Sequence, residues 1–218
     1  MNFKDFSLAE KLQLYRVVAN NSVRIAEIKN KLALYGYNEE KLTILTTLLQ
    51  EVEGLTDTQA REYGEQYAAT EQVTLAHKTA HKVYMKHVKL ARILFEDDLA
   101  AYGALGLQGR RKDTMSGWLR QASSFYNNLL ANETYITALA SFNCPLESLT
   151  QGKDFVEAVA TALEEQDRER GEARKATRVR DEKLELLDSE MSRLLKVLGI
   201  AFEEDPEILE QLGITVAS

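Results

Sequence analysis

The sequence predicts an all-α protein, and three observations support that prediction. Apolar residues recur at helical rather than alternating spacing along almost the whole chain, and no β-rich run is bounded by turn residues. Only 2 prolines occur in 218 residues, where average usage would give roughly 11. Both come late, at Pro145 and Pro206, so the long first part of the chain lacks the residue that breaks helices most strongly.

The first predicted helix runs from about residue 8 to residue 35 and begins with a capping box of Ser7 and Glu10. Its core-facing positions keep a strict 4–3 spacing, the period of a coiled coil: Leu14, Val18, Asn21, Ile25, Ile28, Leu32 and Tyr35. Gly36 suits the left-handed position after a helix, and Asn38 can cap the next one. A turn this short predicts an antiparallel neighbour.

The second predicted helix covers about residues 39–101 and contains no proline. We expect it to be continuous through Gly54 and Gly64, because a glycine costs a helix about 1 kcal/mol without ending it. The 4–3 spacing passes through both glycines, by way of Thr56, Gln59, Tyr63, Gln66 and Thr70. A break near Gly54–Asp57 is the alternative.

The second half of the chain repeats this combination of a shorter and a longer helix. A glycine-rich loop at 102–113 precedes a predicted helix at about 114–142, which Asn132 can interrupt. The last long helix is predicted at about 153–200. An acidic tail at 203–218 follows, in which Pro206 fits the first position of a short helix.

These lengths predict an elongated antiparallel helical bundle. The two long helices (39–101 and 153–200) would each be flanked in one half by a shorter helix (8–35 and 114–142), with coiled-coil-like packing. Residues 1–218 would form a single helical domain of two three-helix segments end to end. A compact four-helix bundle is the alternative. Polar residues at the middle of both long helices predict a solvated face with i,i+4 charge pairs, and a polar belt that fixes the register of the two helices is the alternative.

Composition narrows the classes of function. Hydrophobic residues make up 44% and charged residues 28% of the chain, which is typical of a globular protein. A net charge of −7 argues against a protein that mainly coats nucleic acid. The one cysteine, Cys144, cannot form an intramolecular disulfide, and the sequence shows neither a signal peptide nor an apolar run of membrane-spanning length. We therefore expect a cytoplasmic protein without a cofactor and without a membrane anchor.

The three histidines lie within eleven residues, and two of them form a candidate metal site. His77 and His81 are four residues apart and share a helix face, a spacing that can present two imidazoles to one ion. Carboxylates of the last long helix, such as Asp167, could complete the site. Neither Glu-x-x-His nor His-Glu-x-x-His occurs, so ordinary structural histidines are the alternative.

Basic residues of the second half form a candidate contact surface. The stripe consists of Lys78, Lys82, Lys86, Lys89 and Arg92, with no acid before Glu96, and Arg110 and Arg111 follow in the loop. This surface can meet an acidic partner, a phosphate-bearing ligand or another copy of the chain. Pairing with acids of the last long helix, such as Glu165 and Glu169, is the alternative. Nucleic acid is the less expected partner, because the aromatic residues sit at core spacing.

The sequence therefore predicts a non-enzymatic structural or protein-interaction bundle that binds a partner protein or associates with itself, for instance as a homodimer. No Ser/His/Asp arrangement or apolar carboxylate pair marks a catalytic site, and Cys144 has no histidine nearby in sequence. A first alternative is a metal- or small-ligand-binding bundle that uses His77 and His81. A second is binding of an acidic ligand or nucleic acid by the stripe from Lys78 to Arg92.

Overall fold

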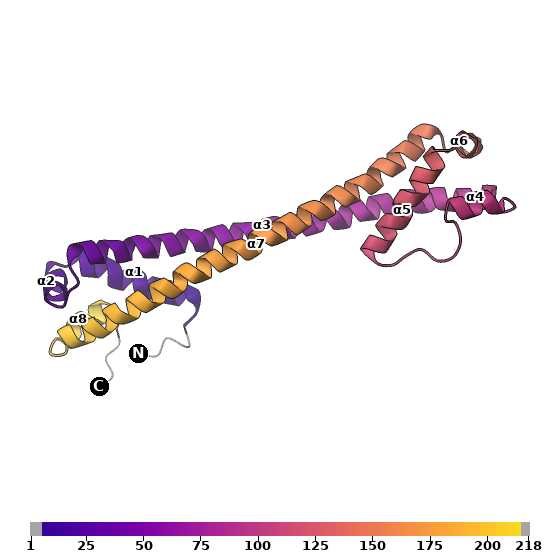
Figure 1. Ribbon diagram of the computed structural model, residues 1–218. Coiled ribbons are helices and arrows are strands. Elements are labelled where there is room, and N and C mark those ends of the chain that lie inside the picture. Colours follow the sequence, from indigo (N-terminus) through magenta and orange to yellow (C-terminus); the bar gives the residue numbers. More distant parts are fainter. Residues whose placement is uncertain (1–5, 215–218) are drawn as a thin grey trace. The chain divides into compact units, whose positions relative to one another are not determined.

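The computed structural model describes residues 6–214, which form eight helices and contain no strand (Figure 1). The predicted all-α helical bundle is confirmed. The chain divides into two compact units: unit 2 is Tyr63–Gly171, and unit 1 comprises the described residues before and after it. Two long helices, α3 (Glu39–Leu94) and α7 (Leu146–Ala201), contribute to both units. Among the described helices, none combines the length and the apolar character that a membrane span needs.

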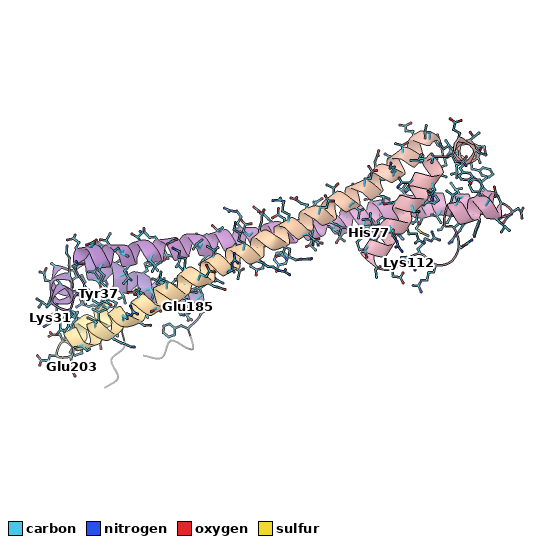
Figure 2. All side chains as sticks on the ribbon, in the orientation of Figure 1. Lys31, Tyr37, His77, Lys112, Glu185 and Glu203 are labelled. Atoms are coloured by element: carbon cyan, nitrogen blue, oxygen red, sulfur yellow. The ribbon has the colours of Figure 1, made fainter. Side chains whose placement is uncertain are left out.

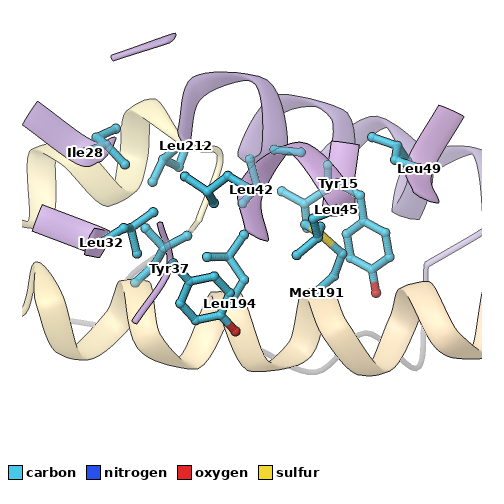
Figure 3. Close-up of a cluster of buried hydrophobic side chains, with 14 of the residues drawn as sticks. Tyr15, Ile28, Leu32, Tyr37, Leu42, Leu45, Leu49, Met191, Leu194 and Leu212 are labelled. Carbon is cyan, nitrogen blue, oxygen red and sulfur yellow. The ribbon is translucent and has the colours of Figure 1, made fainter. Parts of the chain in front are cut away.

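Unit 1 packs α1 (Leu8–Arg24), α2 (Ala26–Leu34) and α8 (Pro206–Gln211) against the nearer parts of α3 and α7. Its core is mostly aliphatic, and Figure 3 shows leucines of α3 such as Leu45 facing Leu194 and Met191 of α7. Local signals act as predicted. Ser7 and Glu10 form the capping box, Asn38 accepts a hydrogen bond from the Lys41 amide, and Gly36 adopts a φ of 81°.

The predicted helix at 8–35 is interrupted at Ile25, whose backbone is extended (φ −88°, ψ 111°). This single residue redirects the chain, so that α2 no longer continues the line of α1 (Figure 1). Ile28 and Leu32 of α2 are fully buried in the unit 1 core as a result. The strict 4–3 spacing did not reveal the break, because Ile25 is neither proline nor glycine and no side chain caps α2.

Unit 2 packs α4 (Leu99–Ala104), α5 (Met115–Leu130) and α6 (Glu133–Ala140) against the remaining parts of α3 and α7. Its core is rich in aromatic residues that meet edge to face, among them Tyr84, Trp118, Phe125 and Tyr126. The predicted interruption of the helix at 114–142 is present, and Asn132 caps α6 by accepting from the Thr134 amide.

Two helix ends differ from the predictions. The helix predicted to reach residue 101 ends at Leu94, because Asp98 accepts hydrogen bonds from the amides of Ala100 and Ala101 and so begins α4. The helix predicted to begin near residue 153 starts at Leu146, directly after Pro145. Gly152 is thus a helical residue: a Cβ atom there would lie 2.3 Å from the Tyr126 hydroxyl, so glycine is what allows Tyr126 to contact α7.

Within each unit, α3 and α7 run antiparallel and are joined by a polar side-chain pair. In unit 1 the Gln59 amide donates to the Thr177 hydroxyl (2.9 Å). In unit 2 the Gln166 amide donates to the Thr70 hydroxyl (3.1 Å). The part-buried Gln59–Thr177 pair favours this alignment of the two helices, whereas the Gln166–Thr70 pair is exposed to water and contributes less.

The buried residues along α3 keep the predicted spacing more closely in unit 1 than in unit 2. Leu42, Leu45, Leu49 and Val52 in unit 1 follow the predicted 3–4 pattern. In unit 2 the buried residues of α3 include Val73, Ala80, Tyr84, His87 and Ala91, which keep the 3–4 spacing, and also Ala69 and Val88 beside this line. Tyr63 and Thr70, which the same spacing placed toward the core, are exposed.

Candidate functional site

One side of α3 in unit 2 carries a row of exposed residues that we call the basic face. It consists of Leu75, Lys78, Lys82, Lys86, Lys89 and Ile93. Successive members are three or four residues apart, so they lie along one side of the helix. The lysines are all exposed, and the apolar ends of the row are exposed to 57% at Leu75 and 62% at Ile93. The face therefore offers four positive charges between two aliphatic contacts.

The four lysines have no ion-pair partner within residues 6–214. The acids that were predicted as alternative partners are engaged elsewhere: Arg168 binds both Glu165 and Glu169. The hydrogen bond from Arg168 lowers the pKa of Glu165. No acid interrupts α3 between Glu71 and Glu96. The charge of the basic face is thus not neutralised by the unit on which it lies.

Two of the predicted contact residues, Arg92 and Arg111, hold the loop that leads to α5. Arg92 donates from Nε to the Leu107 carbonyl and from Nη2 to the Gly109 carbonyl. Arg111 donates from Nη2 to the carbonyls of Gly106 and Gln108. All four distances are 2.8–2.9 Å. Nη1 of Arg111 also donates to the Tyr84 hydroxyl (3.0 Å). These guanidinium groups satisfy backbone acceptors, so they position the loop rather than extend the basic face.

Arg110 lies between these positions in sequence but is an exposed residue. Its guanidinium pairs with Asp113 at 3.2 Å, and both side chains are more than three-quarters exposed. A pair so open to water contributes little to stability. Arg110 therefore stays a prediction as a partner-contact residue.

The candidate metal ligands His77 and His81 pack around Trp118 of α5. The Trp118 indole N–H donates to Nδ1 of His81 (3.0 Å), so this ring nitrogen is the acceptor. The His77 ring meets the edge of Trp118 with centroids 4.4 Å apart, and burial together with His81 lowers the pKa of His77. Within the described chain, no group of three potential metal ligands includes either histidine. Both rings contribute to the packing of Trp118, and their role as metal ligands stays a prediction.

Sequence reasoning missed a polar cluster that surrounds His87. This histidine is 1% exposed, with Nδ1 2.9 Å from the Tyr126 hydroxyl and Nε2 3.2 Å from the Ser148 hydroxyl. Burial lowers the pKa of His87 to about 4, so the ring is neutral at pH 7, with one nitrogen donating and the other accepting. No local signal could reveal the cluster, because its members lie on α3, α5 and α7.

Cys144 lies beside this cluster and is also buried, at 1% exposure. Burial raises the pKa of its thiol, against the smaller opposing effect of the Ser148 hydroxyl. The thiolate is the nucleophilic form, so a buried, protonated thiol is poorly suited to catalysis. The cluster can fix the packing of three helices, whereas the basic face can bind a negatively charged partner. Comparisons with known protein families, with curated proteins and with solved structures found no match.

Proposed function

We propose that this protein is a non-enzymatic interaction module that binds an acidic protein partner on the basic face of unit 2. One observation carries the proposal: four exposed lysines lie in a row on one helix without an ion-pair partner in the described chain. In unit 1, by contrast, several cations pair across helices, including Lys11 with Asp188 and Arg16 with Glu53. Unmatched charge on a regular surface attracts and orients a partner of the opposite sign.

The two aliphatic ends of the basic face favour a protein over nucleic acid. Leu75 and Ile93 can be covered by apolar side chains of a partner helix, whereas single-stranded nucleic acid needs aromatic platforms for its bases. The net charge of −7 also opposes binding of a long polyanion. An amphipathic segment with acids at helical spacing fits both the lysines and the aliphatic ends.

The proposal includes coiled-coil packing of α3 and α7 in unit 1, supported by the heptad-compatible burial of Leu42, Leu45, Leu49 and Val52. It also places the protein in the cytoplasm, where the single thiol Cys144 would stay reduced. Binding rather than catalysis is supported by the burial of the one cysteine and of His87.

A binding assay with defined probes tests the function. Fluorescence anisotropy is measured with a labelled acidic amphipathic peptide, with polyglutamate of equal charge and with a short DNA duplex. The test variant reverses Lys78, Lys82, Lys86 and Lys89 to Glu. The matched control reverses four exposed cations of unit 1 that lack an ion-pair partner in the described chain: Lys31, Arg174, Lys175 and Lys196.

We expect the amphipathic peptide to bind more tightly than polyglutamate or DNA, with an affinity that falls as salt screens the lysines. Reversal of the basic face should weaken binding at least tenfold, and the control should bind like the natural protein. Equal weakening by both variants would show that only overall charge matters. Preferential binding of DNA would replace the protein partner with nucleic acid.

Self-association is the form of this function in which a second copy supplies the acids. Sedimentation velocity at low and high salt distinguishes self-association from binding of a different protein. A second copy is the partner if the chain forms a dimer that dissociates in high salt and that the basic-face variant does not form. A chain that stays monomeric in both conditions assigns the face to a different protein.

A further inference from the structure

A cleft of about 280 Å³ lies in unit 2 between the loop before α5 and the outward side of α5. Loop residues Leu105, Gly106 and Lys112 line it, together with Gly117, Arg120, Gln121 and Ser124 of α5. The four helical residues follow the spacing i, i+3, i+4 and i+7, so they form one continuous stripe. The buried residues of α5, which include Trp118 and Phe125, lie on the adjacent side of this helix.

The lining of this cleft is rich in hydrogen-bond donors. Lys112 and Arg120 are exposed cations without an ion-pair partner in residues 6–214. The side-chain oxygen of Gln121 accepts the Lys112 backbone N–H (3.1 Å), which leaves the Gln121 NH₂ group as a donor. Ser124 adds a hydroxyl. No acid lines the cleft, whereas the cleft between α1 and α3 includes Glu53 and Asp57.

The backbone and the first side-chain carbons of Lys112 are in contact with α5, while its ammonium group is exposed; Figure 2 labels the residue on the loop. Its backbone is fixed to Gln121, and its side-chain stem lies against Gly117, where an added Cβ would be 3.1 Å from the Lys112 Cβ and 2.7 Å from the Thr114 hydroxyl. The loop itself is fixed by Arg92 and Arg111, which bind four of its carbonyls. An ordered loop backbone reduces the entropy that is lost when the residues it carries bind a ligand.

We propose that this cleft binds the phosphoryl group of a small molecule, with Lys112 and Arg120 as its cationic contacts and Gln121 and Ser124 as neutral donors. Guanidinium and ammonium groups are the common protein partners of phosphate oxygens, and Arg can bind two oxygens at once. The first turn of α5 carries no acid, so the positive end of this helix adds to the attraction. The site is separate from the basic face of α3 and does not depend on the function proposed for it.

The volume of the cleft limits the ligand to a small one. Ligand pockets commonly measure about 300–1,000 Å³, so this cleft is slightly smaller than that range. Leu105, which is buried, supplies an apolar wall and makes no hydrogen bond through its side chain. A phosphate monoester with a short carbon chain matches a lining of donors and one aliphatic wall, and free inorganic phosphate is the other source of the same group.

The test is an NMR titration of the full chain at low ionic strength with inorganic phosphate and, separately, with glycerol 3-phosphate. Backbone amides of Gly117 and Arg120 and the side-chain amide of Gln121 report binding. Lys112→Ala and Arg120→Ala remove the cations singly. Arg110→Ala is the matched control, because Arg110 is an exposed neighbouring cation that does not line the cleft. The spectra also show whether each variant remains folded.

We expect saturable shifts at the three reporters and an affinity at least tenfold weaker in Lys112→Ala and Arg120→Ala, with Arg110→Ala unchanged. Tighter binding of glycerol 3-phosphate identifies a monoester as the ligand, and tighter binding of inorganic phosphate identifies the free ion. Shifts that sodium chloride reproduces at equal ionic strength, or equal weakening by all three variants, would overturn the proposal. Gly117→Ala should weaken binding as well, because its methyl group displaces the Lys112 stem.

Discussion

Units 1 and 2 share α3 and α7 but use them differently. Unit 1 surrounds an aliphatic core with charged pairs that cross between helices, such as Lys183 with Glu51. Unit 2 buries an aromatic core together with a hydrogen-bonded histidine, and it leaves the four lysines of the basic face unpaired. In unit 1, several ion pairs hold neighbouring helices together. In unit 2, buried polar groups such as His87 hold the helices together, and the exposed lysines of the basic face stay available for binding.

The largest expected effect is on the close contact between α7 and α5 in unit 2. Gly152→Ala places a methyl group where the Tyr126 hydroxyl lies, so it should lower the free energy of unfolding by about 3 kcal/mol. Gly171→Ala is the control, because a Cβ there meets nothing within 4 Å, and it should be neutral or stabilising by up to about 1 kcal/mol. Urea denaturation measures the free energy of unfolding of both variants. Equal stability of the two would show that the Tyr126 side chain can move away from residue 152 at little energetic cost.

The next effect is the response of unit 2 to acid. Because the pKa of folded His87 is about 4 and its ordinary value is 6.5, the unfolded chain takes up a proton between these pH values that the folded chain does not. The contribution of neutral His87 to the free energy of unfolding is fully present above pH 6.5. It should fall by on the order of 2–3 kcal/mol as the pH approaches 4. His87→Gln should remove this part of the pH dependence in urea titrations. If the free energy of unfolding of His87→Gln depended on pH as steeply as that of the natural protein, His87 would not be the group responsible.

A smaller effect is expected for the interhelical ion pair of unit 1. Asp188 accepts hydrogen bonds from the Tyr15 hydroxyl (3.0 Å) and from the Lys11 ammonium (2.9 Å). Asp188→Asn should cost about 1 kcal/mol, because it removes the charge but keeps an acceptor. It should also lower the pKa of Tyr15 only in part, because burial is the largest single cause of its elevation and remains in the variant. NMR of the Tyr15 ring in alkali measures the change, and a fully ordinary pKa would show that burial is unimportant.

The smallest effect compares one helix cap from each unit. In unit 1 Ser7 and Glu10 bind each other reciprocally, whereas in unit 2 Thr114 accepts one long hydrogen bond from the Gly117 amide (3.3 Å). Ser7→Ala should therefore cost about 1 kcal/mol and Thr114→Ala roughly 0.5 kcal/mol. Thermal unfolding orders the two variants. The reverse order would mean that the single cap of α5 matters more than the capping box.

Features that depend on neighbouring residues could be predicted from the sequence. Ser7 with Glu10, Gly36 and Asn38 each act within one helical turn, so their residue types suffice to locate helix ends. The continuity of α3 through Gly54 was also predicted, because a glycine weakens a helix without ending it and the 4–3 spacing continues through this residue. The break at Ile25 has no such signal, because Ile25 is neither proline nor glycine and no side chain caps α2.

Features that depend on distant contacts could not be predicted. Gly152 looks like a helix boundary in sequence, but it makes room for Tyr126. Arg92 and Arg111 looked like surface cations, but they bind loop carbonyls that only the folded chain brings to them. The lysines of the basic face were found from their spacing alone, since an exposed row on one helix is a local property.

We propose that the basic face of unit 2, rather than any cation of unit 1, contacts the acidic partner. Lysine acetylation followed by mass spectrometry tests it directly, with and without the acidic amphipathic peptide. We expect the peptide to protect Lys78, Lys82, Lys86 and Lys89 at least severalfold and to leave Lys31, Lys175 and Lys196 unprotected. Equal protection of both sets, or protection of the unit 1 lysines alone, would contradict the claim.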